Sequence, residues 1–231
     1  MSESEPTTDG DVSREVAQRV FAGEFNDASY TFKDSDDDRA PVYLLLPTGE
    51  HANRVFIVGT LTETEDVGED NEYWRGRIVD PTGTFFVYAG QYQPDAASTL
   101  REAEPPAYVA VVGKPRTYET DDGDINVSVR PESITEVDAA TRDRWVVETA
   151  DRTLDRIAAF DDAGNEYARM AGEQYGDDLS RYTQTVVDGL ETLESTDELA
   201  VQSPTNADGG AADSDDTAGD AVDAADPSPQ P

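Results

Sequence analysis

The chain is predicted to be mainly β with flanking helices, built around one small barrel. Five short runs rich in β-branched and aromatic residues lie between positions 54 and 136, and turns separate them. One helical segment is inserted between the third run and the fourth. The order strand, strand, strand, helix, strand, strand is the ground plan of a five-stranded OB-fold barrel.

The first three strands are expected at Arg54–Glu65, Tyr73–Val79 and Thr84–Ala89. Gly59 lies inside the first of them, and an interior glycine often marks the bend or bulge that a small barrel needs to close. Asp80-Pro81-Thr82-Gly83 places proline and glycine where tight turns favour them. The second and third strands are therefore expected to form a hairpin.

The second half of the barrel begins with a helix. Pro94–Glu102 has helical spacing and lies where an OB fold places its capping helix, and Pro105-Pro106 ends it. The fourth and fifth strands are expected at Tyr108–Thr120 and Ile125–Ile134, joined by a turn at Asp121-Asp122-Gly123-Asp124.

The N-terminal part precedes this barrel domain, which is assigned to residues 51–137. Residues 1–12 are polar and expected to be disordered. In residues 13–50 the sequence predicts a helix from Ser13 to Phe25 and a short extended run at Pro41–Gly49, an additional strand against the barrel.

Helices are predicted after the barrel, over residues 138–200. Asp138 suits the N-cap of a helix through Phe160, and a helical apolar seam recurs from Tyr175 to Leu193. This seam either packs within the chain or docks on a partner subunit. Residues 201–231 are expected to be a disordered acidic tail, since from 202 onward they hold seven aspartates and no basic residue.

The charge of the chain is strongly acidic. Against 51 Asp plus Glu there are 17 Lys plus Arg, of which only Lys33 and Lys114 are lysines, and the formal net charge is −34. Acid-rich, lysine-poor composition throughout the body is typical of halophilic proteins, because molar salt screens surface repulsion. A haloarchaeal cytoplasm is the expected location, and the alternative is an ordinary acidic protein with a disordered tail.

The sequence lacks the residues that several classes of protein function require. The chain has no cysteine, which excludes disulfides and thiolate chemistry, and it has no phosphate-binding glycine motif. Its one histidine, His51, is expected to be a solvated loop residue in a Gly-Glu-His-Ala turn. No apolar run approaches the length of a membrane span. We therefore expect a non-enzymatic, cytoplasmic protein without cofactor, metal or membrane contact.

Strand alternation indicates which side chains could meet nucleic acid. Arg75 and Arg77 share one side of their strand and are expected to point outward, because a buried unpaired arginine is costly. In the next strand Phe86 and Tyr88 are expected outward, opposite a tapered interior set. That interior set is Phe85, Val87 and Ala89. A register error of one residue would reverse this assignment.

The arm between the fourth and fifth strands adds a second basic spot. Lys114-Pro115-Arg116 is followed by Tyr118, and the loop beyond commonly contacts ligand in this fold. The candidate nucleic-acid-binding residues are therefore Arg75, Arg77, Phe86, Tyr88, Lys114, Arg116, Tyr118 and Arg130. Alternatively, the rings serve packing and the arginines form surface ion pairs. Tyr92 could equally stack on a ligand or anchor the capping helix.

Two stretches resemble a known family. Residues 54–61, RVFIVGTL, and residues 73–94, YWRGRIVDPTGTFFVYAGQYQP, are similar to the archaeal replication protein A-associated proteins, especially their haloarchaeal members. The resemblance covers roughly residues 13–160. It implies an OB-fold partner of a larger replication protein A subunit, acting on single-stranded DNA in DNA replication and DNA repair.

The resemblance also implies how this partner is bound. The helix after the fifth strand is placed like the one through which such subunits associate. The candidate partner-binding residues on it are Trp145, Val146, Leu154 and Ile157. An alternative keeps the barrel as an interaction module that stabilises or regulates its partner without contacting DNA. The barrel's acidity favours this alternative, since residues 54–137 hold seven basic and sixteen acidic side chains, a net of −9.

Overall fold

The fold was taken from a computed structural model, which describes residues 15–37 and 40–201, the last of these from 194 onward by backbone alone. The polar N-terminus at 1–12 and the acidic tail from 202, both expected to be disordered, lie outside the described residues.

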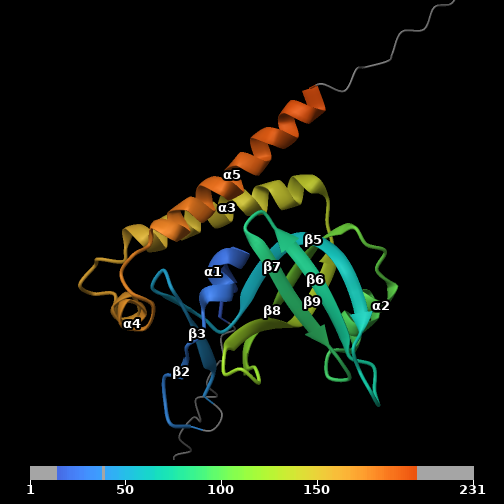
Figure 1. The fold of residues 1–231 in the computed structure, drawn as a ribbon, viewed down its shortest axis with the longest axis horizontal. Coiled ribbons are helices and arrows are strands. Elements are labelled where there is room, and N and C mark those ends of the chain that lie inside the picture. Colours follow the sequence, from blue (N-terminus) through green and yellow to red (C-terminus); the bar gives the residue numbers. More distant parts are fainter. Residues whose placement is uncertain (1–14, 38–39, 202–231) are drawn as a thin grey trace, which may run out of the picture.

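A closed five-stranded barrel forms the centre of the molecule, as predicted (Figure 1). Its strands follow the order β5-β6-β7-β9-β8, and β5 also pairs with β8 to close it. The β7–β9 pairing is parallel and the others are antiparallel. The strands are β5 (Val55–Asp66), β6 (Trp74–Asp80), β7 (Gly83–Ala89), β8 (Ala107–Glu119) and β9 (Ile125–Glu136), with helix α2 (Pro94–Glu102) between β7 and β8.

Alternating side chains fill the barrel, and glycines let its strands approach. Leu100 of α2 is fully buried against the interior. A Cβ at Gly76 would lie 2.8 Å from Leu100, and one at Gly59 would lie 2.6 Å from the carbonyl oxygen of Val79. The register shift of β5 against β6 falls after Leu61. Gly59 is thus required because β5 and β6 approach closely at this position, and it does not form the irregularity itself.

The N-terminal segment differs from its prediction. A helix from Ser13 to Phe25 was expected, but Gln18–Arg19 form strand β1, parallel to Val55–Phe56 of β5. From residue 15 to residue 30 the described chain forms one helix, α1 (Ala22–Asp27), and Ser13 lies outside the described residues. The exposed backbone edge of β5 offers hydrogen-bond partners, so Gln18–Arg19 are extended along it. The apolar residues that follow are buried in the core.

A second, three-stranded sheet adjoins the barrel. It consists of β2 (Thr31–Lys33), β3 (Val42–Leu46) and β4 (Glu50–Ala52) in that order. The expected strand within 41–49 is confirmed as β3, although it pairs with β2 and β4 and not with the barrel. The solvated-loop prediction for His51 was wrong: its ring is half-buried in β4, 4.2 Å from the ring of Tyr167.

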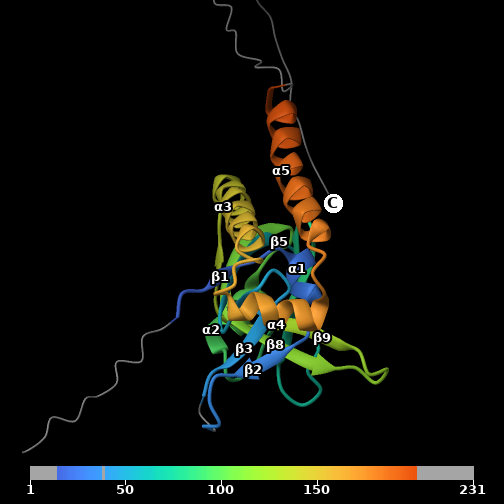
Figure 2. The same cartoon turned by 90° about the vertical axis from the view of Figure 1, so that its left-hand side faces the viewer.

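Three helices follow the barrel: α3 (Ala139–Ala158), α4 (Glu166–Tyr175) and α5 (Ser180–Val201). The predicted N-cap is confirmed, since the Asp138 carboxylate accepts a 2.8 Å hydrogen bond from the Thr141 amide. The seam from Tyr175 is interrupted by Gly176, whose φ of 88° ends α4. Helices α3 and α5 run in opposite directions across one end of the barrel (Figures 1 and 2).

The N-terminal segment, strands β3 and β4, the barrel and helices α3 and α5 contribute to a common hydrophobic core. Phe21 from the N-terminal segment packs edge-on against Trp145 of α3, with ring centroids 5.6 Å apart, and Phe25 packs on Phe85 of the barrel at 5.4 Å. Within the described residues, none of the helices is both long enough and apolar enough to cross a membrane.

Candidate nucleic-acid interface

The outward face of β6 and β7 carries the predicted arginines and rings. Arg75 lies opposite Tyr88 and Arg77 opposite Phe86, and all four are half-buried. The interior set of β7, with Phe85 as its largest member, is fully buried. The inward and outward directions predicted from strand alternation are therefore confirmed.

The two arginines of β6 differ in their partners. Arg75 lies over the Phe86 ring at 5.9 Å and forms an ion pair of 2.5 Å with Glu65. Arg77 donates to the hydroxyls of Thr62 and Thr84 at 3.1 and 3.4 Å, and no described carboxylate pairs with it. Arg77 consequently keeps more of its charge available to a ligand than Arg75 does.

A ring that the sequence analysis did not select completes this face. Tyr73 stacks on Tyr88 with ring centroids 5.7 Å apart and planes inclined by 20°, and it is 45% exposed. The Asp66 carboxylate accepts hydrogen bonds from the backbone amides of Tyr73 and Gly68, and these bonds lower its pKa. A Cβ at Gly90 would lie 2.8 Å from the Tyr73 ring. A signal was present in the sequence, because Tyr73 precedes Trp74 by one position and so shares the side of Arg75.

The β8–β9 hairpin brings the second basic spot to the same face. Lys114 lies opposite Arg130, and Arg116 lies opposite Ser128. Burial, and then the charge of Arg130, lower the pKa of Arg116, although a guanidinium stays protonated in proteins. The structure thus brings together side chains from β6, β7, β8 and β9 that are far apart in the sequence.

The tyrosines line an open surface cavity at this junction. It has a volume of about 390 Å³ and is lined by Tyr73, Tyr88, Arg116, Thr117, Tyr118 and Ser128. Burial raises the pKa of Tyr88, and the neighbouring Tyr118 raises it further while Arg75 lowers it. The Tyr88 ring is therefore neutral at physiological pH, and all three rings offer flat stacking surfaces that suit a heterocycle.

Three cations at this junction lack carboxylate partners. Lys114, Arg116 and Arg130 form no ion pair with any described residue. By contrast, Arg54 and Arg101 of the same barrel each pair with a glutamate, at 2.7 and 3.0 Å. We call the whole outward set the basic–aromatic strip. It comprises Tyr73, Arg75, Arg77, Phe86, Tyr88, Lys114, Arg116, Tyr118 and Arg130.

The four residues predicted to bind a partner subunit differ in their exposure. Trp145 and Val146 are buried, and the Trp145 Nε1–H donates to the carbonyl of Phe56 at 3.1 Å. They belong to the core and are unavailable to a partner, so their selection is corrected: the side of α3 that they occupy covers the barrel. Leu154 is 44% exposed and Ile157 is half-buried.

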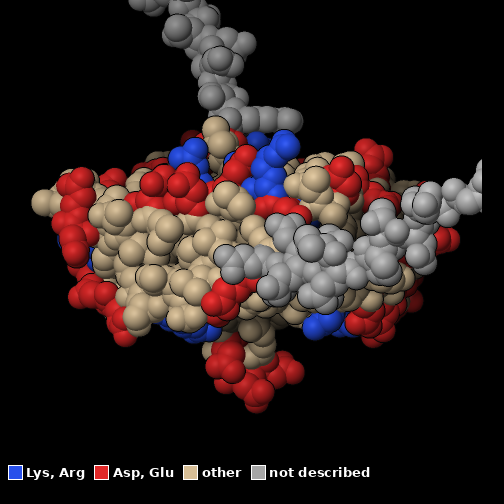
Figure 3. All heavy atoms as spheres, turned by 90° about the horizontal axis from the view of Figure 1, so that it is seen from above, with Lys and Arg blue, Asp and Glu red and all other residues tan. Residues whose placement is uncertain are grey.

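Further apolar side chains lie near Leu154 on the helical face. Val147 of α3 and Val187 and Leu190 of α5 are 50%, 41% and 36% exposed. Seen from this side, a broad area left of centre carries no charge, and acidic side chains with some basic ones lie around it (Figure 3).

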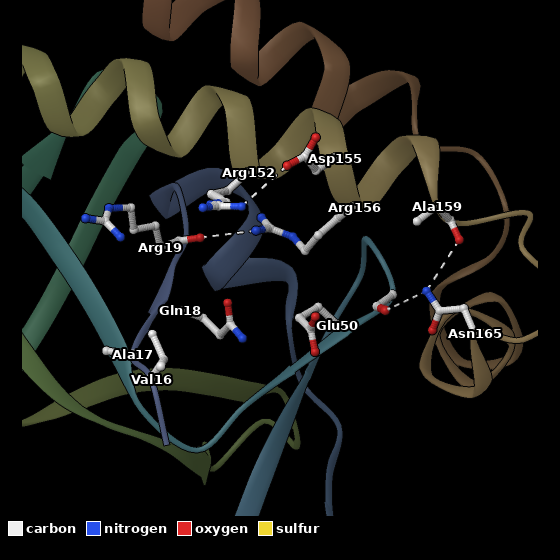
Figure 4. A pocket seen from close by; sticks show the side chains of 11 residues that line it. Val16, Ala17, Gln18, Arg19, Glu50, Arg152, Asp155, Arg156, Ala159 and Asn165 are labelled. Carbon is white, nitrogen blue, oxygen red and sulfur yellow. Dashed lines mark hydrogen bonds and ion pairs between the residues drawn. The ribbon is translucent and has the colours of Figure 1, made fainter. Parts of the chain in front are cut away.

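A second cavity, of about 360 Å³, lies between β1, the β3–β4 turn and α3 (Figure 4). Arg19, Glu50, Arg152, Asp155 and Arg156 line it, so both signs of charge are present. Its guanidiniums are engaged within the chain, Arg19 with Glu148 at 2.8 Å and Arg152 with Asp155 at 3.6 Å. Arg156 pairs with Glu24 and Glu50 with His51, so each described charged residue of the lining has a partner within the chain.

Comparisons with known proteins add only a similarity of fold. No protein-family model matches the chain, and no curated protein matches it. The second single-stranded DNA-binding protein of Mycobacterium smegmatis matches 37% of this chain and 86% of its own, at 18% identity and a TM-score of 0.32. An OBody bound to hen egg-white lysozyme matches 37% of this chain and 80% of its own, at 15% identity and a TM-score of 0.30.

The asparaginyl-tRNA synthetase of Pyrococcus horikoshii matches the same share of this chain but only 20% of its own, at 18% identity and a TM-score of 0.30. Similarities at this level say nothing about ligands. The identification of the barrel rests on its own strand order and closure.

Proposed function

We propose that this chain binds single-stranded DNA through the basic–aromatic strip, as a subunit of a replication protein A-like complex in DNA replication and repair. The observation that carries the proposal is the tyrosine-lined cavity beside three cations that have no carboxylate partner in the part of the chain that the structure describes. Tyr73, Tyr88 and Tyr118 supply flat surfaces for bases, and Arg116 and Arg130 supply charge for the phosphates that follow.

The acidity of the chain determines how stacking and charge contribute to the affinity for DNA. With a net charge of −34, long-range attraction of a polyanion is absent, and in molar salt counterion release contributes little to any complex. Base–aromatic stacking, worth about 1–3 kcal/mol per base, is far less sensitive to salt. Stacking is therefore the main source of affinity, and the cations set the register of the strand.

The complex is proposed from the family resemblance and from the helical face. The partner would be a replication protein A large subunit that contacts Leu154 and Ile157 on α3, together with the exposed Val187 and Leu190 on α5. Recovering a tagged copy from high-salt extract should co-purify such a subunit. Its absence from the recovered material would contradict this part of the proposal.

DNA binding is tested with the full chain. Fluorescence anisotropy of labelled oligo-dT in molar KCl should show saturable binding, which Phe86→Ala and Arg116→Ala weaken roughly 5- to 100-fold. Arg152→Ala is the matched control, because Arg152 is 64% exposed on α3 and lies outside the strip. Absence of binding, or equal binding by all variants, would refute the DNA-binding role.

The second candidate function is an interaction module that regulates a replication protein A partner without touching DNA. The observation in its favour is that acidic side chains accompany the strip, with Glu65 neutralising Arg75. The same two measurements separate the candidates, because this one predicts recovery of the partner together with no affinity of the chain for DNA.

A further inference from the structure

The β8–β9 hairpin changes sign along its length. At its base lie Lys114, Arg116 and Arg130, whereas no basic residue occurs from 117 to 129. Its tip carries the exposed acids Glu119, Asp121, Asp122 and Asp124. Glu119 lies only three positions, about 10 Å of strand, beyond Arg116.

The tip also projects from the body. Strands β8 and β9 pair as far as Glu119 and Ile125 and extend beyond the rest of the barrel (Figure 2). From above, the same hairpin is the acidic projection at the lower edge of Figure 3. A DNA strand that followed the hairpin outward would bring its phosphates beside four carboxylates.

The opposite end of the strip is acidic too. On β5, Glu65 and Glu63 lie 2.5 and 4.0 Å from the Arg75 guanidinium. The cationic part of the face therefore extends from β6 to the base of β8. With the order β6-β7-β9-β8 this is three strand spacings, or about 14 Å at about 4.8 Å each.

The length of a nucleotide and the number of available cations each limit how many nucleotides this width can bind. At the stacked spacing of about 3.4 Å per nucleotide of one strand, 14 Å accommodates about four nucleotides, and an extended strand fewer. The cations without a carboxylate partner among the described residues of the strip are Arg77, Lys114, Arg116 and Arg130, which allow one phosphate contact each.

We infer that the strand crosses the base of the β8–β9 hairpin and is kept from its tip, so that this chain holds four nucleotides or fewer. The inference rests on the proposed function and specifies the ligand of that site as a short single-stranded segment. A longer strand must then be held by another chain of the complex.

The footprint is measured by competition. Unlabelled dT2, dT4, dT6 and dT8 displace labelled dT4 from the full chain, at the lowest KCl concentration at which circular dichroism shows the native fold. The association constant of each oligomer is divided by the number of registers in which that oligomer can occupy the site. This corrected value should rise up to dT4 and then stay constant. A continued rise to dT8 would overturn the footprint, whereas no binding of any oligomer would instead overturn the proposed function.

The role of the tip is tested with Asp121→Asn/Asp122→Asn/Asp124→Asn. All three positions are exposed, so the variant should keep its fold, and it should bind dT8 several-fold more tightly than the wild type while dT4 is unaffected. In 2 M KCl the gain should be smaller, because the Debye length falls below 3 Å and only close charges still interact.

Asp151→Asn/Asp161→Asn/Glu173→Gln removes the same charge from exposed sites on and after α3 and should leave both affinities unchanged. An unchanged dT8 affinity in the hairpin variant, or an equal gain in the control, would refute exclusion by the tip.

Discussion

The guanidinium of Arg156 donates a 2.6 Å hydrogen bond to the carboxylate of Glu24, and both side chains are almost fully buried. Thr48 bonds to both of them and thereby closes a three-residue network. Arg156 is on α3, Glu24 on α1 and Thr48 in the β3–β4 turn, so the network joins the helical region to the N-terminal segment and the second sheet.

We expect Arg156→Met to lower the free energy of unfolding by about 3–5 kcal/mol, because it leaves the Glu24 carboxylate buried without a charge partner. Denaturant unfolding in high salt measures this change. The double variant Glu24→Gln/Arg156→Met should regain part of the loss. Arg152→Met, at an exposed site on the same helix, is the control and should change stability by less than about 0.5 kcal/mol. An equal loss in the control would show that the buried pair is not the cause.

Tyr73→Ala should weaken binding of oligo-dT by about 1–3 kcal/mol, roughly 5- to 150-fold, because it removes one stacking surface of the cavity. Tyr73→Phe should retain most of the affinity, since the ring remains. Tyr30→Ala serves as the matched control, as Tyr30 is 38% exposed beside β2 and outside the strip. An equal loss at Tyr30 would show that stacking on Tyr73 is not the cause.

Replacing one unpaired cation should change the salt dependence of binding rather than only its strength. For single strands each neutralised phosphate contributes about −0.7 to the slope of log K against log salt concentration. Arg116→Gln and Arg130→Gln should each reduce the magnitude of that slope by about 0.7. Arg75→Gln should reduce it less, because Glu65 already neutralises this arginine. Anisotropy titrations over a range of KCl concentrations give the slopes, and identical slopes for all three variants would contradict the assignment.

Gly59→Ala should destabilise the barrel by at least about 1–3 kcal/mol, because the added Cβ would lie 2.6 Å from a backbone oxygen that cannot move without separating β5 from β6. Gly164→Ala is the control. Its Cβ would have an ordinary contact of 3.6 Å, so its stability should be unchanged or raised by up to about 1 kcal/mol. Thermal and denaturant unfolding of the two variants test whether close strand contact is what requires glycine.

Stability should fall as the pH rises through the pKa of His51. The Glu50 carboxylate, 2.8 Å from Nδ1, raises this pKa above its ordinary value, with burial opposing it. The stabilisation is therefore complete below the pKa of the unfolded chain, about 6.5, and is lost above the raised pKa of the folded chain. Unfolding free energies at pH 6 and pH 8 measure the difference. His51→Gln should remove it, since the chain has no other histidine, and a variant with an unchanged pH dependence would assign the effect elsewhere.

Local sequence pattern predicts much of the barrel and of its outward face. Alternation alone separated Phe86 and Tyr88 from the buried residues of β7, since successive side chains of a strand point to opposite faces whatever surrounds it. Helix α2 has the predicted bounds Pro94–Glu102, and Asp138 caps α3 as expected, because proline and capping residues act on their own helix ends.

Other features were decided only when distant segments met. Gln18–Arg19 is a strand because β5 has a free edge beside it, and Trp145 is buried because the barrel, and not a partner, covers that side of α3. His51 is packed because α4 supplies Tyr167. Tyr73 belongs to the site because β7 places Tyr88 beneath its ring, and Arg116 joins them because β9 pairs with β8 on one side and β7 on the other. Residue type and spacing determined which way each strand faces, whereas long-range pairing determined which side chains share a surface.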